Sequence, residues 1–190
     1  MLNRASIFGL ASAAIGISVA ATALADSFSF TFSVDNTAIS GSGTLQANAN
    51  GGGSFTATSG TGTVTGIPDG SVLTLIANPN APSSFSTSPS GAFWYDDQLL
   101  PQSANPLLTV NGLLFGVGSG AEINIWGNSP DNYSLWLHNA GGDVIQLGGP
   151  NVHFNYASVP EASTMLFGLA GVMPLMSLRR RQRAAATPVA

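Results

Sequence analysis

The stretch Ser27-Phe28-Ser29-Phe30-Thr31-Phe32-Ser33-Val34 decides the fold class of this chain. Every second residue in it is apolar, and the residues between are serine or threonine. Because neighbouring side chains of a β-strand point to opposite faces, this period of two predicts a strand with one buried face. The segment therefore indicates a β domain that begins close to it.

Segments of smaller residues follow with a similar pattern. Residues 41–48, 54–58 and 61–66 are rich in serine, threonine and glycine, and they are separated by Gly51-Gly52-Gly53 and by Ser59-Gly60. Glycine clusters and Ser-Gly pairs are typical of turns. These segments are therefore expected to form a meander of short strands.

The middle of the chain is more apolar and richer in proline. Residues 71–77 predict a more deeply buried strand, whereas residues 78–90 predict a surface loop, either a lid or a crossover between sheets. Residues 107–110 and 113–117 flank Asn111-Gly112, a dipeptide that is a strong signal for a β-hairpin.

The remaining segments complete an all-β pattern. Residues 122–126 and 133–138 flank a polar loop, and residues 143–147 and 151–156 flank Gly148-Gly149-Pro150. We count about ten to twelve short strands and no amphipathic helix between the two ends of the chain. The pattern predicts an antiparallel β-sandwich or flattened barrel.

The N-terminal residues 1–25 have the features of a secretory signal peptide. Arg4 lies in a short basic region, an apolar stretch follows, and Ala23-Leu24-Ala25 precedes Asp26. Small residues at Ala23 and Ala25 are the pattern that signal peptidases cleave. We expect cleavage before Asp26 and export of the rest of the chain.

The C-terminal region has three ordered parts: Val159-Pro160-Glu161, an apolar run over 165–178, and an arginine cluster. The run would be about 21 Å long as a helix, against a hydrocarbon core of about 30 Å, and residues 162–164 extend it to a marginal span. The alternative is a buried helix of a soluble domain, but the run has no polar face. The cluster should remain on the cytoplasmic side; it consists of Arg179, Arg180, Arg181 and Arg183.

This tail resembles a PEP-CTERM sorting domain, in which a Val-Pro-Glu-Pro motif precedes a transmembrane stretch and a basic cluster. Val159, Pro160 and Glu161 match the motif, and Ala162 stands where the family has its second proline. The resemblance implies an exported substrate of a membrane protease called exosortase, in a bacterium that makes exopolysaccharide. It implies an inner-membrane anchor before processing and no catalytic residue.

The domain organisation is therefore a signal peptide at 1–25, an extracytoplasmic β domain at 26–158, a sorting segment at 159–183 and a short tail at 184–190. The β domain contains eight carboxylates and no lysine or arginine, a charge of about −8. Nothing in it can neutralise a phosphate strongly, which excludes nucleic-acid binding. Charged residues make up 7% of the chain, against about 25% in ordinary soluble proteins, and cysteine is absent.

Catalytic motifs are missing from the β domain. Asp96-Asp97 is the only adjacent carboxylate pair, and Glu122 or Asp131 could add a partner for glycoside cleavage. Neighbouring residues of a strand point to opposite faces, however, so a turn-capping role is favoured for the pair. There is no Gly-x-Ser-x-Gly elbow and no phosphate-binding loop. We predict that the protein is not an enzyme.

Metal ligands are sparse. His138 and His153 are the only histidines, and neither has the spacing of a zinc ligand. Calcium is the better candidate ion, because Asp69, the pair Asp96-Asp97, and Asp131 place hard oxygen ligands beside expected turns. We expect no other cofactor and assign no metal ligands.

Aromatic residues are the best candidates for binding. We select Trp94, Tyr95, Asp96 and Asp97 as candidate ligand-binding residues, because the aromatic run 93–95 could stack on sugar rings. Trp126 and Trp136 could join that platform, but we expect them to be cross-strand partners in the core.

Three functions remain. The first is a non-enzymatic cell-surface or biofilm-matrix protein, exported and processed by an exosortase-like protease. The second is a carbohydrate-binding module, which requires a solvent-facing aromatic strip beside polar groups. The third is a glycan hydrolase, which requires two carboxylates facing each other across a cleft at about 5–10 Å.

Overall fold

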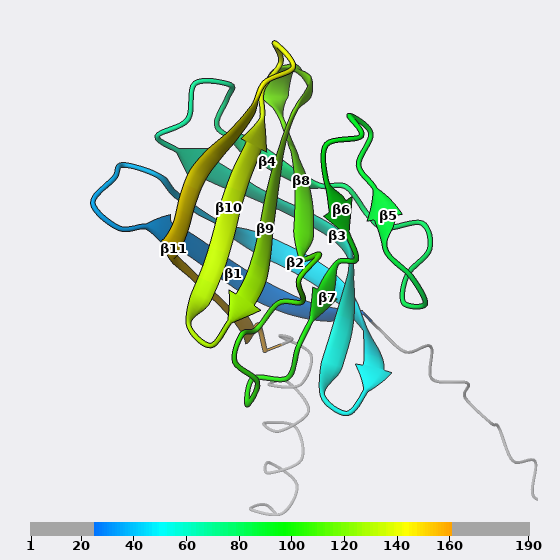
Figure 1. The fold of residues 1–190 in the computed structure, drawn as a ribbon. Helices are drawn as coiled ribbons and strands as arrows, with labels where there is room; N and C mark the ends of the chain where they lie inside the picture. Colours follow the sequence, from blue (N-terminus) through cyan, green and yellow to red (C-terminus); the bar gives the residue numbers. More distant parts are fainter. Residues whose placement is uncertain (1–24, 161–190) are drawn as a thin grey trace, which may run out of the picture.

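Eight antiparallel strands of the chain pair into a closed, barrel-like sheet (Figure 1). The computed structural model describes residues 25–160. Each barrel strand pairs with the next barrel strand along the chain, including β2 with β3. Pairing of the first strand, β1, with the last, β11, closes the barrel. A ninth strand, β7, adds to the edge of β3, and β5 and β6 form a separate pair. The predicted all-β class is confirmed.

The elements have the following bounds: β1 Asp26–Val34, β2 Ser40–Gly51, β3 Ser54–Thr65, β4 Val72–Leu75, β5 Ser86–Thr87, β6 Trp94–Tyr95, β7 Gln98–Leu99, β8 Leu113–Val117, the 3-10 turn η1 Gly118–Gly120, β9 Ala121–Ser129, β10 Asn132–His138 and β11 Val144–Ser158.

Strand β1 confirms the alternation that decides the fold class. Its apolar residues all lie inside the barrel, and its serines and threonines lie outside or at the rim. Phe30 is 1% exposed and stacks on Phe115 of β8, with ring centroids 5.2 Å apart. The interior is packed with such side chains from every barrel strand.

The small residues of β2 make room for the large rings of β1. Gly41 and Gly43 lie directly opposite Phe32 and Phe30 in the antiparallel register. A Cβ atom on Gly41 would lie 2.3 Å from the Phe32 ring, and one on Gly43 would lie 2.2 Å from the carbonyl oxygen of Thr61. The glycine-rich composition of this strand is therefore required by close packing.

Two predicted turns are wrong, because glycine serves close packing there as well. Strand β3 runs without interruption through Ser59-Gly60, and β11 runs through 148–150. A Cβ on Gly60 would lie 2.5 Å from Leu45, and one on Gly148 would lie 2.7 Å from Val34. Glycine inside a strand often marks such close approach rather than a chain reversal.

The predicted hairpin around Asn111-Gly112 is also wrong. In the segment before it, Leu108 makes one isolated bridge, to Leu99, and no strand precedes β8 there. Gly112 has a φ of 66°, and its carbonyl oxygen accepts the backbone N–H groups of Asp96 and Asp97 at 3.2 and 3.0 Å. The turn before β8 is thus hydrogen-bonded to Asp96 and Asp97 and does not form a hairpin with residues 107–110.

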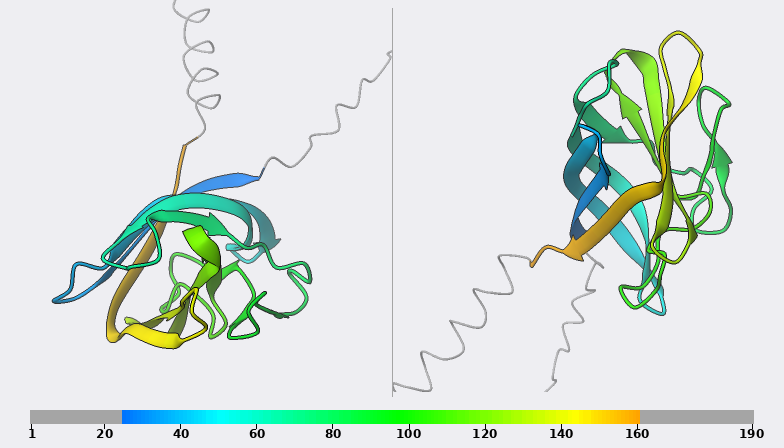
Figure 2. Two further views of the ribbon diagram at one scale, coloured as in Figure 1. Left: turned by 90° about the horizontal axis from the view of Figure 1, so that it is seen from above. Right: turned by 60° about the vertical axis from the view of Figure 1, so that its left-hand side comes forward.

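Residues 76–112, between β4 and β8, form an insertion whose first part packs on the outer face of the barrel, whereas Leu99 and Leu108 join the barrel core. Figure 2 shows the sheet curving round its interior with part of this segment on its outer side. Phe93 and Tyr95 of the insertion bury Leu114, whose side chain points out of the barrel. Trp136 of β10 packs against the same small cluster. This contact places the insertion beside β8, β9 and β10.

The two ends of the β domain meet. The backbone N–H of Val159 donates to the carbonyl oxygen of Ser27 at 2.7 Å, and Phe28 pairs with Ser158. Within residues 25–160 there is no helix of the length and hydrophobicity needed to cross a bilayer. The expected signal-peptide and sorting features other than Ala25, Val159 and Pro160 lie outside the described residues; they are Ala23, Glu161, Arg179, Arg180, Arg181 and Arg183.

Candidate functional site

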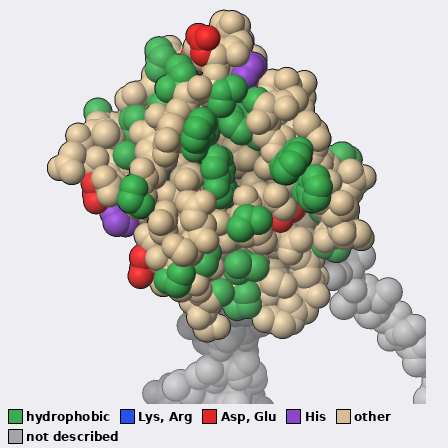
Figure 3. Space-filling model, viewed as in Figure 1, with side chains coloured by type: hydrophobic (Ala, Val, Ile, Leu, Met, Phe, Trp, Pro, Cys, Tyr) green, Lys and Arg blue, Asp and Glu red, His purple; other side chains and the backbone are tan. Residues whose placement is uncertain are grey.

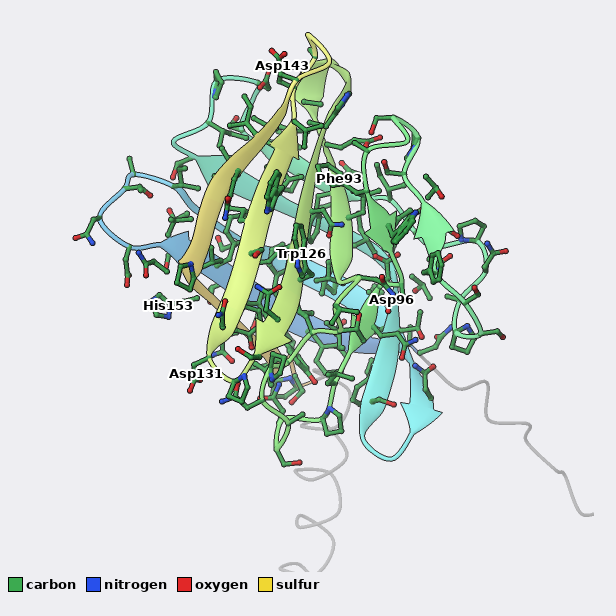
Figure 4. The ribbon with its side chains drawn as sticks, in the orientation of Figure 1. Phe93, Asp96, Trp126, Asp131, Asp143 and His153 are labelled. Atoms are coloured by element: carbon green, nitrogen blue, oxygen red, sulfur yellow. The ribbon has the colours of Figure 1, made fainter. Side chains whose placement is uncertain are left out.

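A groove with a volume of about 370 Å³ opens between the insertion and the outer face of β9. We call it the aromatic groove. Its lining residues come from three separate parts of the chain: Gly91, Ala92, Phe93, Trp94, Val110, Asn111, Asn124 and Trp126. Figure 4 shows Phe93 and Trp126 in the middle of one face of the molecule.

Trp94 is the most exposed aromatic side chain of the groove. It belongs to β6, in which the two residues point to opposite sides, so that Trp94 is 63% exposed while Tyr95 is buried. Phe85, also exposed, lies beside Trp94 with ring centroids 5.5 Å apart. The insertion thus presents two neighbouring rings to solvent.

Trp126 and Trp136 stack on each other across β9 and β10, with ring centroids 6.2 Å apart and planes at 25°. Both are half-buried on the outer face of the barrel, so our expectation that they are core residues is wrong. Alternation explains their position. Ile123 and Ile125 point inward on β9, which requires Trp126 to point outward.

Asn124 lies between the insertion and the barrel. Its side chain is 2% exposed, and its Nδ2 donates to the carbonyl oxygen of Trp94 at 2.8 Å. Its Oδ1 is a buried acceptor with no hydrogen-bond partner among the described residues. A buried amide oxygen without a donor is uncommon in proteins and favours a ligand or water.

Asp96 is buried behind the groove. Its carboxylate accepts the Thr109 hydroxyl at 2.7 Å and Nδ2 of Asn111 at 3.2 Å. Its Oδ1 also accepts the backbone N–H of Gln98 at 3.2 Å, which confirms the turn-capping role. The residue orders the loop that carries Val110 and Asn111 of the groove.

Asp97 is fully buried and has a φ of 57°. Its Oδ2 accepts the backbone N–H of Asn78 at 2.7 Å, and its Oδ1 accepts that of Leu114 at 3.4 Å. Burial raises the pKa of this carboxyl to about 8, against the lowering effect of these two hydrogen bonds. The carboxyl is therefore largely protonated at neutral pH and joins the insertion to β8.

Glu122 connects another part of the insertion, at Ser90, to β9. It is buried on the outer side of β9 and accepts both the backbone N–H of Ser90, at 3.0 Å, and the Ser90 hydroxyl. Asp131 lies apart from it in the turn between β9 and β10, where it interacts with Asn105. Figure 4 shows Asp131 well separated from Asp96.

Among the described residues, the histidines and carboxylates do not gather into a metal site. His153 lies 3.1 Å from Asp35 at the surface, and Nδ1 of His138 has no partner among the described residues. Within residues 25–160 there is no group of three or more histidine and acidic side chains that could hold a metal ion. The aspartates considered for calcium, such as Asp69 and Asp131, belong to no such group.

The surface around the groove carries apolar patches among uncharged polar atoms. Figure 3 shows apolar side chains gathered on this face, with scattered acidic groups and no lysine or arginine on the coloured residues. Of the four candidate ligand-binding residues, Trp94 is exposed to solvent, and Tyr95, Asp96 and Asp97 are buried. Sequence reasoning missed Val110, Asn111 and Asn124. Of these three residues, only Asn124 has a local signal in the sequence, because strand alternation places it on the same face as Trp126.

Comparison with protein-family models, with curated proteins and with solved structures found no match to this chain.

Proposed function

We propose that the protein is an exported, non-enzymatic component of the cell surface or exopolysaccharide matrix, and that it binds glycan in the aromatic groove. The observation that carries the proposal is the exposure of Trp94 beside Asn124 and Trp126 in one groove. A solvent-facing aromatic ring next to amide groups is the arrangement that a carbohydrate-binding module requires.

The chemistry of the lining supports this assignment. An indole ring offers a large apolar face to the C–H groups of a pyranose, while amide groups hydrogen-bond its hydroxyls. Asn111 and Asn124 supply those amides. The volume of about 370 Å³ falls within the range of about 300–1,000 Å³ that is typical of ligand sites.

The positions of the carboxylates favour binding over hydrolysis. A glycosidase needs two carboxyl groups that face a bond across a cleft. Asp96, Asp97 and Glu122 each accept hydrogen bonds that hold the insertion in place. These interactions give all three a structural role.

The two ends of the chain support a location in the cell envelope. The signal-peptide pattern before Asp26 supports export across the inner membrane, and the PEP-CTERM-like tail supports recognition by an exosortase-like protease. Cleavage at the tail would release the β domain to the surface or matrix. An exopolysaccharide is the partner that such a location makes available.

Calorimetric titration of the purified protein with neutral, acidic and amino-sugar polysaccharides tests the proposal. We expect at least one of them to bind the wild type, and Trp94→Ala to weaken that binding by about tenfold or more, as loss of a central aromatic contact does. Ile145→Ala is the matched control, because Ile145 is an exposed apolar residue outside the groove. Equal binding by wild type and Trp94→Ala would refute the assignment.

A further inference from the structure

We infer that the glycan bound in the aromatic groove carries free, positively charged amino groups. This inference rests on the proposed function and narrows it to one chemical class, a polymer of amino sugars that are not fully acetylated. It is argued from the charges around the groove, from its aromatic faces and from its unpaired acceptor.

The charge of the β domain selects against acidic glycans. Residues 26–158 contain eight carboxylates and no lysine or arginine, so only His138 and His153 could pair with a uronic acid, a sulfate or a phosphate on a sugar, and neither of them lines the aromatic groove. Like charges repel in the absence of such a partner, and they do so most where water is displaced. The same charge attracts a cationic chain.

Two carboxylates lie directly behind the lining of the groove. Asp96 is hydrogen-bonded to Asn111, whose side chain forms part of the lining. Glu122 is hydrogen-bonded to Ser90, the neighbour of Gly91 at the rim, and lies two residues from Asn124 on the same face of β9. A separation of two residues along a strand is about 7 Å. Both groups are therefore close enough to act on a charge in the groove.

Glu122 also acts on Tyr95, which is adjacent to Trp94. Burial is the first cause that raises the pKa of the Tyr95 phenol, and the carboxyl groups of Asp97 and Glu122 add to it. Because Asp97 is largely protonated at neutral pH, Glu122 supplies the negative charge there. A negative potential thus reaches this part of the insertion, where it disfavours a further anion and stabilises a cation.

The groove also offers the contacts that an ammonium group prefers. The exposed face of Trp94 and the half-buried Trp126 provide aromatic rings for cation–π interaction. An ammonium group has three donors and no acceptor, and Oδ1 of Asn124 is an acceptor without a donor among the described residues. Acetylation would remove the charge and lose the cation–π attraction.

The test compares three hexasaccharides of the same linkage: glucosamine, N-acetylglucosamine and glucose. Each is titrated calorimetrically into the full chain at about pH 5.5, where amines are protonated and ordinary carboxyls are largely ionised. We expect the glucosamine hexamer to bind about tenfold more tightly than the other two, and the preference to shrink when the salt concentration rises from about 50 to 500 mM.

Three variants show whether the preference belongs to the groove. Trp94→Ala should lose most of the binding of the glucosamine hexamer, and Ile145→Ala should retain it. Glu122→Gln keeps the shape of the side chain but removes its charge, so it should reduce the ratio of the affinities for the glucosamine and acetylated hexamers about threefold. Any loss caused by the weakened contact with Ser90 should lower both affinities alike and leave that ratio unaffected.

The outcomes separate this inference from the proposed function. Equal or tighter binding of the acetylated or glucose hexamer would overturn the inference and leave glycan binding in place. Binding of the glucosamine hexamer that is unaffected by Trp94→Ala would mean general attraction to an acidic surface, and would overturn the assignment to the groove. Absence of binding by all three hexamers would overturn the inference, and absence of binding by every polysaccharide of the calorimetric titration above would overturn the proposed function as well.

Discussion

Replacing Asp97 with asparagine should remove most of the pH dependence of folding stability between about pH 4 and pH 8. Asp97 is the fully buried carboxyl that connects the insertion to β8. Its pKa is about 8 in the folded protein, against an ordinary value of 3.8. The folded protein therefore holds a proton at neutral pH that the unfolded chain releases.

The sign and size of the effect follow from this difference. The stability that the protonated Asp97 contributes is fully present below pH 3.8 and is lost as the pH rises through about 8. The free energy of unfolding should fall by about 1.4 kcal/mol for each pH unit in that interval. At pH 7 the accumulated loss is about 4 kcal/mol, a large part of the stability of a small domain.

Asparagine suits this position because it is neutral at every pH and tolerates a positive φ. Its amide oxygen can still accept the backbone N–H of Asn78, whereas the longer contact with Leu114 at 3.4 Å is lost, at a cost of about 1 kcal/mol. The net result should be a variant that is about 3 kcal/mol more stable than the wild type at pH 7.

Urea denaturation followed by tryptophan fluorescence, repeated from about pH 4.5 to pH 8, measures this difference. Asp143→Asn, at an exposed site, is the matched control and should keep the slope of the wild type. A wild type whose stability does not change between pH 5 and pH 7.5 would refute the reasoning. So would an Asp97→Asn variant that retains the slope.

Three further predictions concern packing and processing. Phe30→Ala should lower the free energy of unfolding by about 3–5 kcal/mol in urea denaturation, because its ring is 1% exposed in the barrel interior. Gly112→Ala should lower it by several kcal/mol, or prevent folding, because the new Cβ would lie 1.9 Å from the carbonyl oxygen of Ile125 at a φ of 66°; an unchanged midpoint would contradict the geometry. Intact-mass measurement of the secreted protein should find a species that begins at Asp26 and ends near Glu161, whereas a membrane species that retains the arginine cluster would contradict processing by exosortase.

Three polar side chains beside the aromatic groove connect the insertion to β8 or β9 and suggest how the groove keeps its shape. Asp97 contacts Asn78 and Leu114, Glu122 contacts Ser90, and Asn124 contacts the carbonyl oxygen of Trp94. Each connection joins the insertion to β8 or β9. The buried polar groups of this face thus position the groove, and their loss should affect binding together with stability.

Local alternation made part of the fold predictable. Strand β1 shows it most clearly, because a buried strand face requires an apolar residue at every second position, whatever the strand pairs with. The turns at Ser59-Gly60 and Gly148-Gly149-Pro150 were mispredicted because glycine has two uses. Whether it reverses the chain or makes room for a neighbour depends on distant residues such as Leu45 and Val34.

The residues of the candidate site were predictable only where the alternation of side chains along one strand determines whether a residue is exposed. Trp94 was identified from its aromatic neighbours, and its outward orientation follows from its place in β6. Trp126 could have been assigned to the outer face from the inward position of Ile125. Asn111 and Val110 could not have been assigned to the groove, because they are brought there by the contacts of Asp96 and Gly112.

The amino-acid sequence by itself determined the all-β class and the acidic charge without basic residues, and it predicts targeting signals at the two ends. These properties depend on composition and on the alternation of side chains along a strand, which are local. The tertiary structure alone decided that the first strand, β1, pairs with the last, β11, to close the sheet. It also decided that residues 91–94, 110–111 and 124–126 share one groove and that Asp97 is buried. Closure and burial depend on free energies summed over contacts between segments far apart in the chain, and no single segment encodes them.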